Sequence, residues 1–366
     1  MYKKRIVLIS NIPSPYKVDL FYQLQTNTEE YDFYPIYTND NEDNRSWTPD
    51  ETKMFHSVVL SSRVLKLSTG IDHRYVHLPP SMAPVLNRIN PDAVIAWEYN
   101  PAALMALRWC RKHHKKFIHA TEGTLNSEKN LNVVQKYSRQ YICKHADSFI
   151  ACSTKSKEKL MAWGVDEKDI ETALLTVDIE PYLNLPYTPE SGRILYVGSL
   201  AERKGLDLLV QALPLIRQKF ELHIVGDREC EEKEQLKQLL KDKHLDHKVV
   251  WRGFLQGDEL YREYQEASVF VLPTREDCFG LVLIEALAAG VPIVASRYAD
   301  GAYDVIKDGV NGTIVDPFIP GELAKGIEKY LRNDRDLRTE TKEIVDSFRF
   351  SDVIRHYYRK LSQVIH

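Results

Sequence analysis

The segment Pro273–Ala295, PTREDCFGLVLIEALAAGVPIVA, combines residue types that suit the binding of a phosphorylated sugar. It overlaps a short apolar run at Ser268–Pro273, which predicts a buried parallel strand, and helical apolar spacing begins at Leu281. The free N–H groups and the dipole at the start of that helix would bind phosphate. Asp277 lies before the helix, and Glu285 is expected well past its phosphate-binding end, within reach of a ribose. The segment therefore predicts a nucleotide-sugar site.

The run DCFGLVLIEA within this segment resembles the retaining glycosyltransferases of family 4, the group 1 glycosyltransferases, which have the GT-B fold. It is similar to that family's motif of a carboxylate and a glutamate separated by seven residues, although the family usually has Glu where this chain has Asp277. The resemblance implies that Asp277 touches the donor sugar, Gly280–Leu281 hold the distal phosphate, and Glu285 grips the ribose. The motif implies further donor contacts from Glu276, which is an alternative sugar-facing carboxylate, and from Cys278, Phe279 and Val282.

A second cluster of candidate residues, GSLAERKG, follows the predicted strand Arg193–Val197. In the family this segment supplies cations to the donor diphosphate, and Lys204 matches the family's lysine. Ser199 stands where the family has an arginine, and we expect Arg203 to compensate. These cations would stabilise the charge that gathers on the leaving diphosphate, without a metal ion. Two other donor-side candidates are Gly198 and Phe254, and Phe254 packs either on a nucleobase or in the core.

The predicted strand Lys116–Ala120 delivers polar residues to its C-terminal end, which is where open parallel sheets bind ligands. In the family a histidine near this place often lies beside the donor sugar. The resemblance therefore implies that His119, or Glu122 if the alignment slides, belongs to the catalytic set. A buried, hydrogen-bonded histidine in a strand is an equally good interpretation of His119.

Acceptor-side candidates precede these residues in the chain. Ser14 and Pro15 predict the cap and first residue of a helix, and Glu98 follows another predicted strand. A helix beginning at Pro101 is crowded with cations at its C-terminal end, and no acidic residue lies between Glu98 and Glu122. The cations either complement the helix dipole on a solvated face or meet an anionic membrane or a lipid diphosphate acceptor. They are Arg108, Arg111, Lys112, Lys115 and Lys116.

At 366 residues the chain exceeds what one hydrophobic core usually supports. Because strand and helix signals restart after a linker-like stretch at 185–192, we predict an α/β protein with two Rossmann-like, doubly wound domains that face a cleft. Residues 1–184 would bind the acceptor, residues 185–346 the nucleotide sugar, and a helix at 347–366 would pack back on the first domain. We also predict helices at 206–219 and 281–290 and a hairpin-like turn in DGVNGTIVDP.

The composition of the chain limits the ligands, the metal sites and the cellular compartment that we expect for it. The net charge of −3 argues against general nucleic-acid binding, and no apolar run is long enough for a membrane span. The five cysteines show no paired spacing, so a disulfide framework or zinc site is not expected and a reducing cytoplasm fits. The single Asp-x-Asp pattern, Asp334 to Asp336, reads as solvated surface, so no metal site is predicted.

We therefore predict a metal-independent glycosyltransferase that retains the anomeric configuration. The donor would be a nucleotide sugar, with uridine favoured by family habit, and no other cofactor is expected. The acceptor would be a hydroxyl of a saccharide or lipid-linked molecule in cell-surface polysaccharide assembly, at the cytoplasmic face of the membrane. Ser199 and Asp277 leave open a non-catalytic, nucleotide-binding partner of another transferase, and an epimerase with the same fold is a further alternative.

Overall fold

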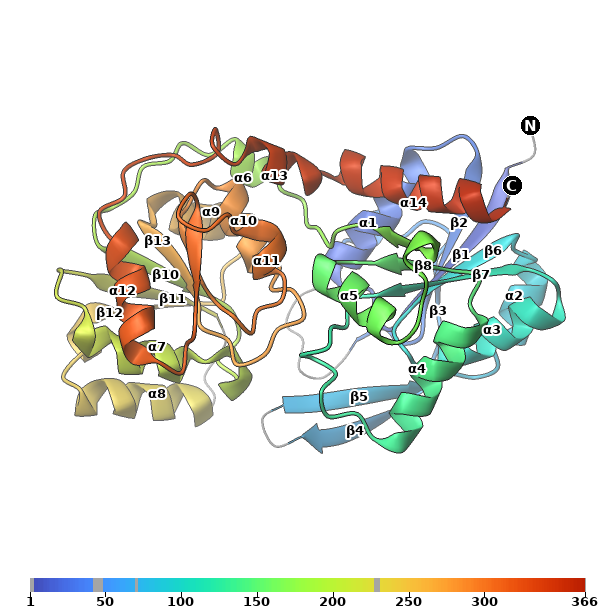
Figure 1. The fold of residues 1–366 in the computed structure, drawn as a ribbon, viewed down its shortest axis with the longest axis horizontal. Coiled ribbons are helices and arrows are strands. Elements are labelled where there is room, and N and C mark those ends of the chain that lie inside the picture. Colours follow the sequence, from blue (N-terminus) through green and yellow to red (C-terminus); the bar gives the residue numbers. More distant parts are fainter. Residues whose placement is uncertain (1–2, 42–48, 70–71, 227–230, 366) are drawn as a thin grey trace. The chain divides into compact units, whose positions relative to one another are not determined.

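The computed structural model describes residues 3–41, 49–69, 72–226 and 231–365 (Figure 1). These residues form two α/β units. The first unit takes the described residues within 1–69, 73–178 and 349–366, and the second takes those within 70–72 and 179–348.

Within the described residues, the first unit is built on a seven-stranded parallel sheet in the order β3-β2-β1-β6-β7-β8-β9. Its central strands are continuous apolar runs because helices bury both faces. The direction in which the chain adds strands reverses between β1 and β6, and ligands bind beyond the strand ends at such switch points. The strands are β1 (Lys4–Ser10), β2 (Tyr31–Tyr37), β3 (Val58–Val59), β6 (Ala93–Trp97), β7 (Lys116–Thr121), β8 (Ser148–Ala151) and β9 (Ile170–Thr172), and β4 (Arg63–Thr69) pairs separately with β5 (Asp72–Leu78).

The helices of the first unit begin at recognisable caps. Asn100 and Asn132 accept backbone N–H bonds at the starts of α3 and α4, and Ser153 does so for α5. Ser14 and Pro15 occupy the predicted cap and first position of α1, although the Ser14 side chain makes no capping bond. The helices are α1 (Pro15–Thr26), α2 (Ala83–Ile89), α3 (Pro101–Lys112), α4 (Val133–His145), α5 (Thr154–Ala162) and α14 (Phe350–Ile365), with short 3₁₀ turns η1 (Glu51–Lys53) and η2 (Glu167–Asp169).

The described part of the second unit contains a six-stranded parallel sheet in the order β12-β11-β10-β13-β14-β15, whose switch point lies between β10 and β13. Its strands are β10 (Arg193–Val197), β11 (Glu221–Val225), β12 (Val249–Gly253), β13 (Val269–Leu272), β14 (Ile293–Ser296) and β15 (Gly312–Val315). Its helices are α6 (Glu180–Leu183), α7 (Leu206–Ala212), α8 (Glu231–Asp242), α9 (Asp258–Glu266), α10 (Val282–Ala288), α11 (Ala302–Val305), α12 (Pro320–Tyr330) and α13 (Lys342–Ser347), with 3₁₀ turns η3 (Glu202–Lys204), η4 (Leu213–Leu215) and η5 (Asp246–Lys248).

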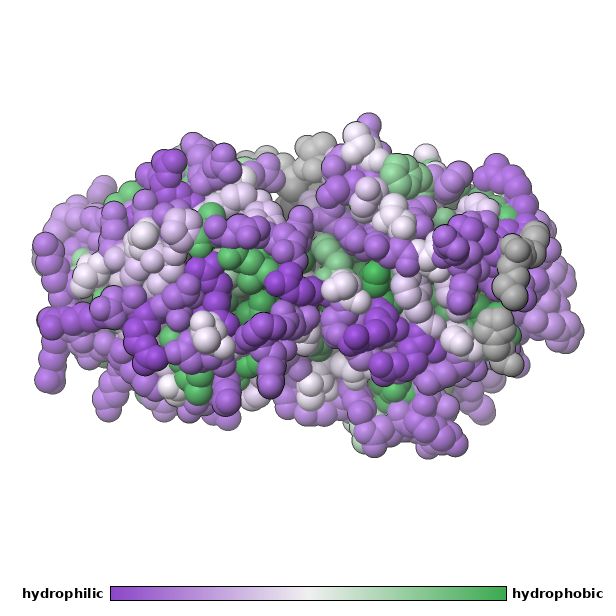
Figure 2. Space-filling model, turned by 90° about the horizontal axis from the view of Figure 1, so that it is seen from above, coloured by the Kyte–Doolittle hydropathy of each residue, from purple (hydrophilic) through white to green (hydrophobic). Residues whose placement is uncertain are grey.

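Each unit has its own hydrophobic core. In the first unit, Val7 and Val94 from the sheet pack with Leu107 of α3, and all three are fully buried. In the second, Ile194 and Val271 pack with Leu209 of α7 in the same way. Hydrophilic side chains dominate the face shown in Figure 2, as expected for the outer positions of helices that cover a sheet.

The C-terminal helix α14 belongs to the first unit, where it packs against α1, β8 and β9. Tyr357 is fully buried, with its ring centroid 6.0 Å from that of Trp97. The neighbouring Tyr358 stacks on Tyr31 at 6.0 Å and donates a hydrogen bond to the carbonyl of Leu24. The predicted return of the C-terminus to the first domain is therefore a helix that supplies part of that domain's core.

Three predicted elements were wrong in detail. The helix predicted at 206–219 ends at Ala212, because Pro214 lacks an N–H group and the chain continues as η4. The helix predicted at 281–290 is shorter, at Val282–Ala288. The predicted hairpin-like turn leads instead into β15, which pairs parallel with β14. Among the described residues, no helix is both long and apolar enough to cross a membrane.

Candidate donor and acceptor sites

The switch point of the second unit brings the two predicted donor loops together. The loop after β10 carries Arg203 and Lys204, and the loop after β13 carries Asp277. Arg203 donates from its guanidinium to the carbonyl of Glu276 at 2.9 Å, and Thr274 donates its hydroxyl to the carbonyl of Arg203 at 2.9 Å. These contacts join residues about seventy positions apart in the chain, so the fold itself holds the cations beside the carboxylate.

Asp277 is the electrostatic centre of this site. Its carboxylate lies 2.5 Å from the ammonium of Lys204 and also accepts the backbone N–H of Phe279 at 3.3 Å. Burial alone raises the pKa of Asp277, but the charges of Lys204 and Arg203 and these hydrogen bonds outweigh that effect and lower its pKa below the ordinary value. Asp277 is therefore an anion at neutral pH, paired with a cation that is 18% exposed.

Three consecutive backbone N–H groups follow this carboxylate, at Gly280, Leu281 and Val282. None of them donates to another residue in the described part of the chain. Gly280 has a φ of +85°, and a Cβ atom there would lie 2.8 Å from a methyl carbon of Leu272. Glycine thus lets the loop turn tightly over β13 and present its amides. These N–H groups are suited to phosphate oxygens, as the sequence predicts.

Glu285 was expected well past the phosphate-binding end of the helix, but it lies in the first turn of α10. It accepts a hydrogen bond from the hydroxyl of Tyr264 at 2.7 Å, and the hydroxyl of Tyr182 also hydrogen-bonds to it. Burial raises the pKa of Glu285, and the two tyrosine hydroxyls oppose that rise. The structure thus adds two tyrosines to the carboxylate that the motif identified.

The remaining donor-side candidates differ in exposure. Phe254 is 49% exposed at the end of β12, so the core interpretation is wrong and its ring is free to stack. Phe279 is buried and packs against Phe348, which makes it a supporting residue. The N–H of Gly198 donates to the carbonyl of Val225, and the hydroxyl of Tyr196 donates to the carbonyl of Ser199. Glu276 and Cys278 are partly exposed beside Asp277.

In the first unit, the ends of β6 and β7 border a cavity of about 180 Å³. Glu98 lines it with a φ of +58°, a conformation that strains a residue other than glycine and is typical of functional sites. Glu122 lines it too, bound by the ammonium of the buried Lys17 and by the hydroxyl of Tyr16 at 3.2 Å. Other lining residues are Trp97, Tyr99, Thr121, Gly123, Glu128 and Arg139.

His119 is fully buried in β7, with its ring centroid 4.3 Å from that of Tyr99. Burial, and then the charges of Lys159 and Arg139, hold the pKa of His119 well below its ordinary value. The imidazole is therefore neutral. Its lack of exposed surface agrees with the interpretation of a buried strand histidine. Neither ring nitrogen makes a hydrogen bond of regular geometry with a described residue, so the hydrogen-bonded part of that interpretation is not met.

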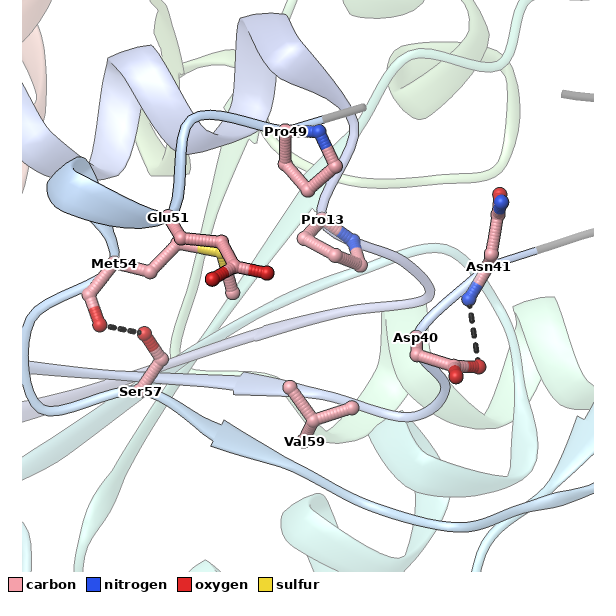
Figure 3. A pocket seen from close by; sticks show the side chains of 8 residues that line it. All are labelled: Pro13, Asp40, Asn41, Pro49, Glu51, Met54, Ser57 and Val59. Carbon is pink, nitrogen blue, oxygen red and sulfur yellow. Dashed lines mark hydrogen bonds between the residues drawn. The ribbon is translucent and has the colours of Figure 1, made fainter. Parts of the chain in front are cut away.

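A second cavity in the first unit, of about 430 Å³, lies beyond the ends of β1 and β2 (Figure 3). Glu51 and Asp40 approach it from opposite sides, and Pro13 lies between them. Ser14 and Pro15 follow Pro13 directly and begin α1. The other lining residues are Asn41, Pro49, Met54, Ser57 and Val59. Carboxylates, an amide and a hydroxyl around such a volume suit the hydroxyl groups of a sugar.

Comparison with known proteins assigns the chain to a family. Residues 187–346 match the family described as glycosyl transferases group 1, and residues 43–180 match glycosyltransferase family 4. The chain belongs to the family 4, group 1 glycosyltransferases. The structure is similar to that of the lipopolysaccharide outer core galactosyltransferase WaaB, with a TM-score of 0.75 and 17% identity over 98% of this chain and 99% of that one. The predicted fold class, two Rossmann-like domains of the GT-B type, is confirmed.

Curated relatives of this family 4 chain come from distant organisms. An uncharacterized glycosyltransferase of Methanocaldococcus jannaschii is 28% identical over 61% of each protein. The lipopolysaccharide 1,6-galactosyltransferase of Salmonella typhimurium is 28% identical over 60% of this chain and 62% of its own length. The alignments thus span about three fifths of these relatives' length. HepE of Anabaena, solved in complex with UDP and glucose, has a TM-score of 0.74 at 16% identity, covering 98% of this chain and 100% of that one.

The sequence analysis did not single out Tyr264 and Tyr182, whose hydroxyl groups hydrogen-bond to Glu285. Tyr264 lies twenty-one residues before Glu285, on α9, so no local spacing connects it with the motif. A buried tyrosine usually finds a hydrogen-bond partner, which is the one signal that pointed to a polar role. The described residues contain no group of three or more His, Cys, Asp or Glu side chains placed to hold a metal ion.

Proposed function

We propose that this chain transfers a sugar from a nucleotide sugar to a hydroxyl group with retention of the anomeric configuration. The observation that carries the proposal is the Lys204–Asp277 pair, which lies beside the N–H groups of Gly280 and Leu281. This arrangement offers a cation and backbone donors to a diphosphate and a carboxylate to a sugar. The family membership supports the assignment.

The reaction needs charge stabilisation more than proton transfer. As the bond to the leaving diphosphate lengthens, negative charge gathers on the diphosphate and the sugar gains oxocarbenium character. Lys204 and the loop N–H groups would oppose the first charge. A preorganised donor of this kind contributes about 3–4 kcal/mol to the transition state in comparable sites. We propose that they act without a metal ion.

The donor is proposed to be UDP-linked, because HepE of the same fold was solved with UDP and glucose. Phe254 would stack on the base and Glu285 would accept the ribose hydroxyl groups. The acceptor is proposed to bind to the first unit, in the cavities bordered by Glu122 and by Glu51. A saccharide or lipid-linked hydroxyl acceptor in cell-surface polysaccharide assembly at the cytoplasmic face is proposed from relatives named as lipopolysaccharide galactosyltransferases.

The first experiment is ligand-observed NMR of the purified protein with a panel of nucleotide sugars. Saturation of base and sugar protons is expected for one donor, which is then supplied with saccharide acceptors in the presence of EDTA. Proton couplings of the product report the anomeric configuration. Donor binding with no transfer to any acceptor would favour the non-catalytic partner, and conversion of the donor alone would favour the epimerase. Absence of nucleotide binding by the folded protein would overturn the proposal.

A further inference from the structure

Two neighbouring helices of the first unit, α3 and α4, contain no acidic residue, although the whole chain has a net charge of −3. They contact each other through packed side chains. Their surface therefore carries a concentration of positive charge that the composition of the chain does not predict. The cationic side chains on these helices are Arg108, Arg111, Lys112, Lys136, Arg139 and Lys144.

The start of α4 also exposes apolar side chains. Val133 is 82% exposed and Val134 is 77% exposed, while Tyr137 one turn later is 64% exposed. Leu125, in the preceding loop, is 52% exposed. Two adjacent aliphatic residues so far out of the core gain nothing from folding, because their apolar surface stays in water. Something other than the unit's own stability has to account for them.

The apolar and cationic residues share one face. Val134, Tyr137 and Tyr141 follow the three- and four-residue spacing that aligns side chains along a helix, and the rings of Tyr137 and Tyr141 lie 6.3 Å apart. From α3, the guanidinium of Arg108 lies 5.9 Å from the centre of the Tyr141 ring, and Arg111 donates to the Tyr141 hydroxyl at 3.4 Å. The exposed valines thus continue into a tyrosine and arginine surface that spans both helices.

The two carboxylates that flank α4, Glu128 and Asp147, pair with Arg139 and Lys116 rather than with Arg108 or Arg111. Glu128, before α4, is held by two hydrogen bonds of 3.0 Å from Arg139. Asp147, after α4, accepts the N–H of Phe117 at 2.8 Å and faces Lys116 at 3.5 Å. The helix dipole explains cations in the last turns of α3 and α4, but not Lys136 or the exposed valines at the start of α4.

We propose that the α3–α4 face, defined as Arg108, Arg111, Val133, Val134, Tyr137 and Tyr141, docks on an anionic lipid bilayer. The arginines would meet lipid phosphates, and the valines with Tyr137 would enter the boundary between headgroups and acyl chains. The positive charge of the arginines is complementary to the anionic headgroups, and the exposed valines are complementary to the apolar layer beneath them. The proposal rests on this face alone and does not depend on the sugar-transfer chemistry.

The test is cosedimentation of the full chain with vesicles of phosphatidylcholine alone or mixed equally with phosphatidylglycerol. Binding is expected only to the anionic vesicles and is expected to weaken as salt is raised. The charge reversals Arg108→Glu and Arg111→Glu together should lower the partition coefficient about 30-fold or more. Val133→Ser with Val134→Ser should lower it about tenfold, because the apolar contribution is lost.

Control variants change exposed or partly exposed residues of the second unit. Lys237→Glu with Lys241→Glu on α8 makes the same type of charge reversal, and Leu215→Ser removes an apolar side chain that is 50% exposed. Neither should change vesicle binding. Circular dichroism and nucleotide binding check that each variant is folded, and nucleotide binding is expected to be unchanged in all of them.

Three results would overturn the docking proposal. The first is a lack of binding to anionic vesicles by a protein that still binds nucleotide. The second is binding that the controls reduce as much as the α3–α4 variants do. The third is a concentration-dependent dimer in sedimentation velocity that Val133→Ser with Val134→Ser abolishes while vesicle binding stays absent, since this would assign the face to a second copy of the chain.

Discussion

At the scale of single residues, the proposed function gives Lys204 the role of opposing the charge that develops on a leaving diphosphate. Lys204→Ala should lower kcat by about 10²–10³, because one preorganised charge-stabilising donor is lost. Lys307→Ala, which removes an exposed lysine of the same unit, should leave kcat unchanged. Steady-state transfer kinetics with the donor found by NMR provide the measurement. Equal activity of the two variants would exclude Lys204 from the reaction.

Glu285 gives the donor site a dependence on pH. In the proposed function its carboxylate accepts ribose hydroxyls, for which it must be ionised. Burial raises the pKa of Glu285, so nucleotide affinity should fall as pH decreases through that raised value. Tyr264→Phe removes a hydroxyl that opposes the rise, and the pKa of Glu285 should increase further. The midpoint of the loss of affinity is therefore expected to move to higher pH, measured by titration calorimetry across pH.

A suitable control for that experiment is Tyr330→Phe. The hydroxyl of Tyr330 donates to the carbonyl of Gly312 at 2.8 Å in the same unit, so its removal also costs a tyrosine hydrogen bond. Tyr330→Phe should lose about 1 kcal/mol of stability, and Tyr264→Phe about 1.5–3 kcal/mol because its hydroxyl donates to a carboxylate. Only Tyr264→Phe should shift the pH dependence of binding, and an identical profile for the two would mean that Tyr264 does not act on Glu285.

The residues that were predictable from sequence are those whose role is set by local spacing. Asp277 and Glu285 lie in one motif on one strand–loop–helix unit, so the sequence placed them at the same strand end. The pairing of Lys204 with Asp277 spans 73 positions, and the pairing of Tyr264 with Glu285 joins α9 to α10 across the intervening strand β13. Such contacts depend on how strands are ordered in the sheet, which local patterns do not contain.

At the scale of elements, Gly205 fixes the loop that carries Lys204. It has a φ of +70°, and a Cβ atom there would lie 2.1 Å from the carbonyl oxygen of Pro273. Gly205→Ala should therefore push the loops after β10 and β13 apart. We expect a loss of roughly 2–4 kcal/mol of stability, since steric overlap adds to the strain of a left-handed backbone, together with weaker nucleotide binding.

Gly253→Ala separates the two causes of this loss of stability, steric overlap and backbone strain. Gly253 also has a φ of +70°, but a Cβ atom there would meet nothing within 4 Å. This variant should lose only the backbone part, about 1 kcal/mol. Urea denaturation of both variants provides the comparison, and equal losses would mean that contact with Pro273 does not fix the loop.

Element boundaries were predictable where a cap or proline marks them. Ser14–Pro15 and Asn132 mark the starts of α1 and α4. The end of α7 depends on Pro214, and the prediction from apolar periodicity alone extended that helix too far. The burial of His119 was not predictable either. A histidine at a strand end faces a ligand or the core according to which side of the sheet it occupies, and the neighbouring Tyr99 and Phe149 settle that in favour of the core.

At the scale of the whole molecule, the two units have separate cores, and α14 completes only one of them. Tyr357→Ala removes a fully buried ring beside Trp97 and should cost about 3–5 kcal/mol, which lowers the unfolding temperature of the first unit by roughly 6–20 °C. Tyr357→Phe keeps the ring and should have a much smaller effect. Differential scanning calorimetry is expected to show two transitions, of which these substitutions move one.

Nucleotide binding should raise the unfolding temperature of the second unit. A ligand that binds only the folded second unit stabilises it by about 2.7 kcal/mol at a hundredfold excess over Kd. The predicted donor residues Lys204, Asp277 and Glu285 all lie in the second unit. Nucleotide should therefore raise the unfolding temperature of that unit by the same amount in the parent chain and in Tyr357→Ala. If nucleotide and Tyr357→Ala instead shifted a single shared transition, the two units would unfold as one cooperative body, and stability changes in α14 would then propagate to the donor site.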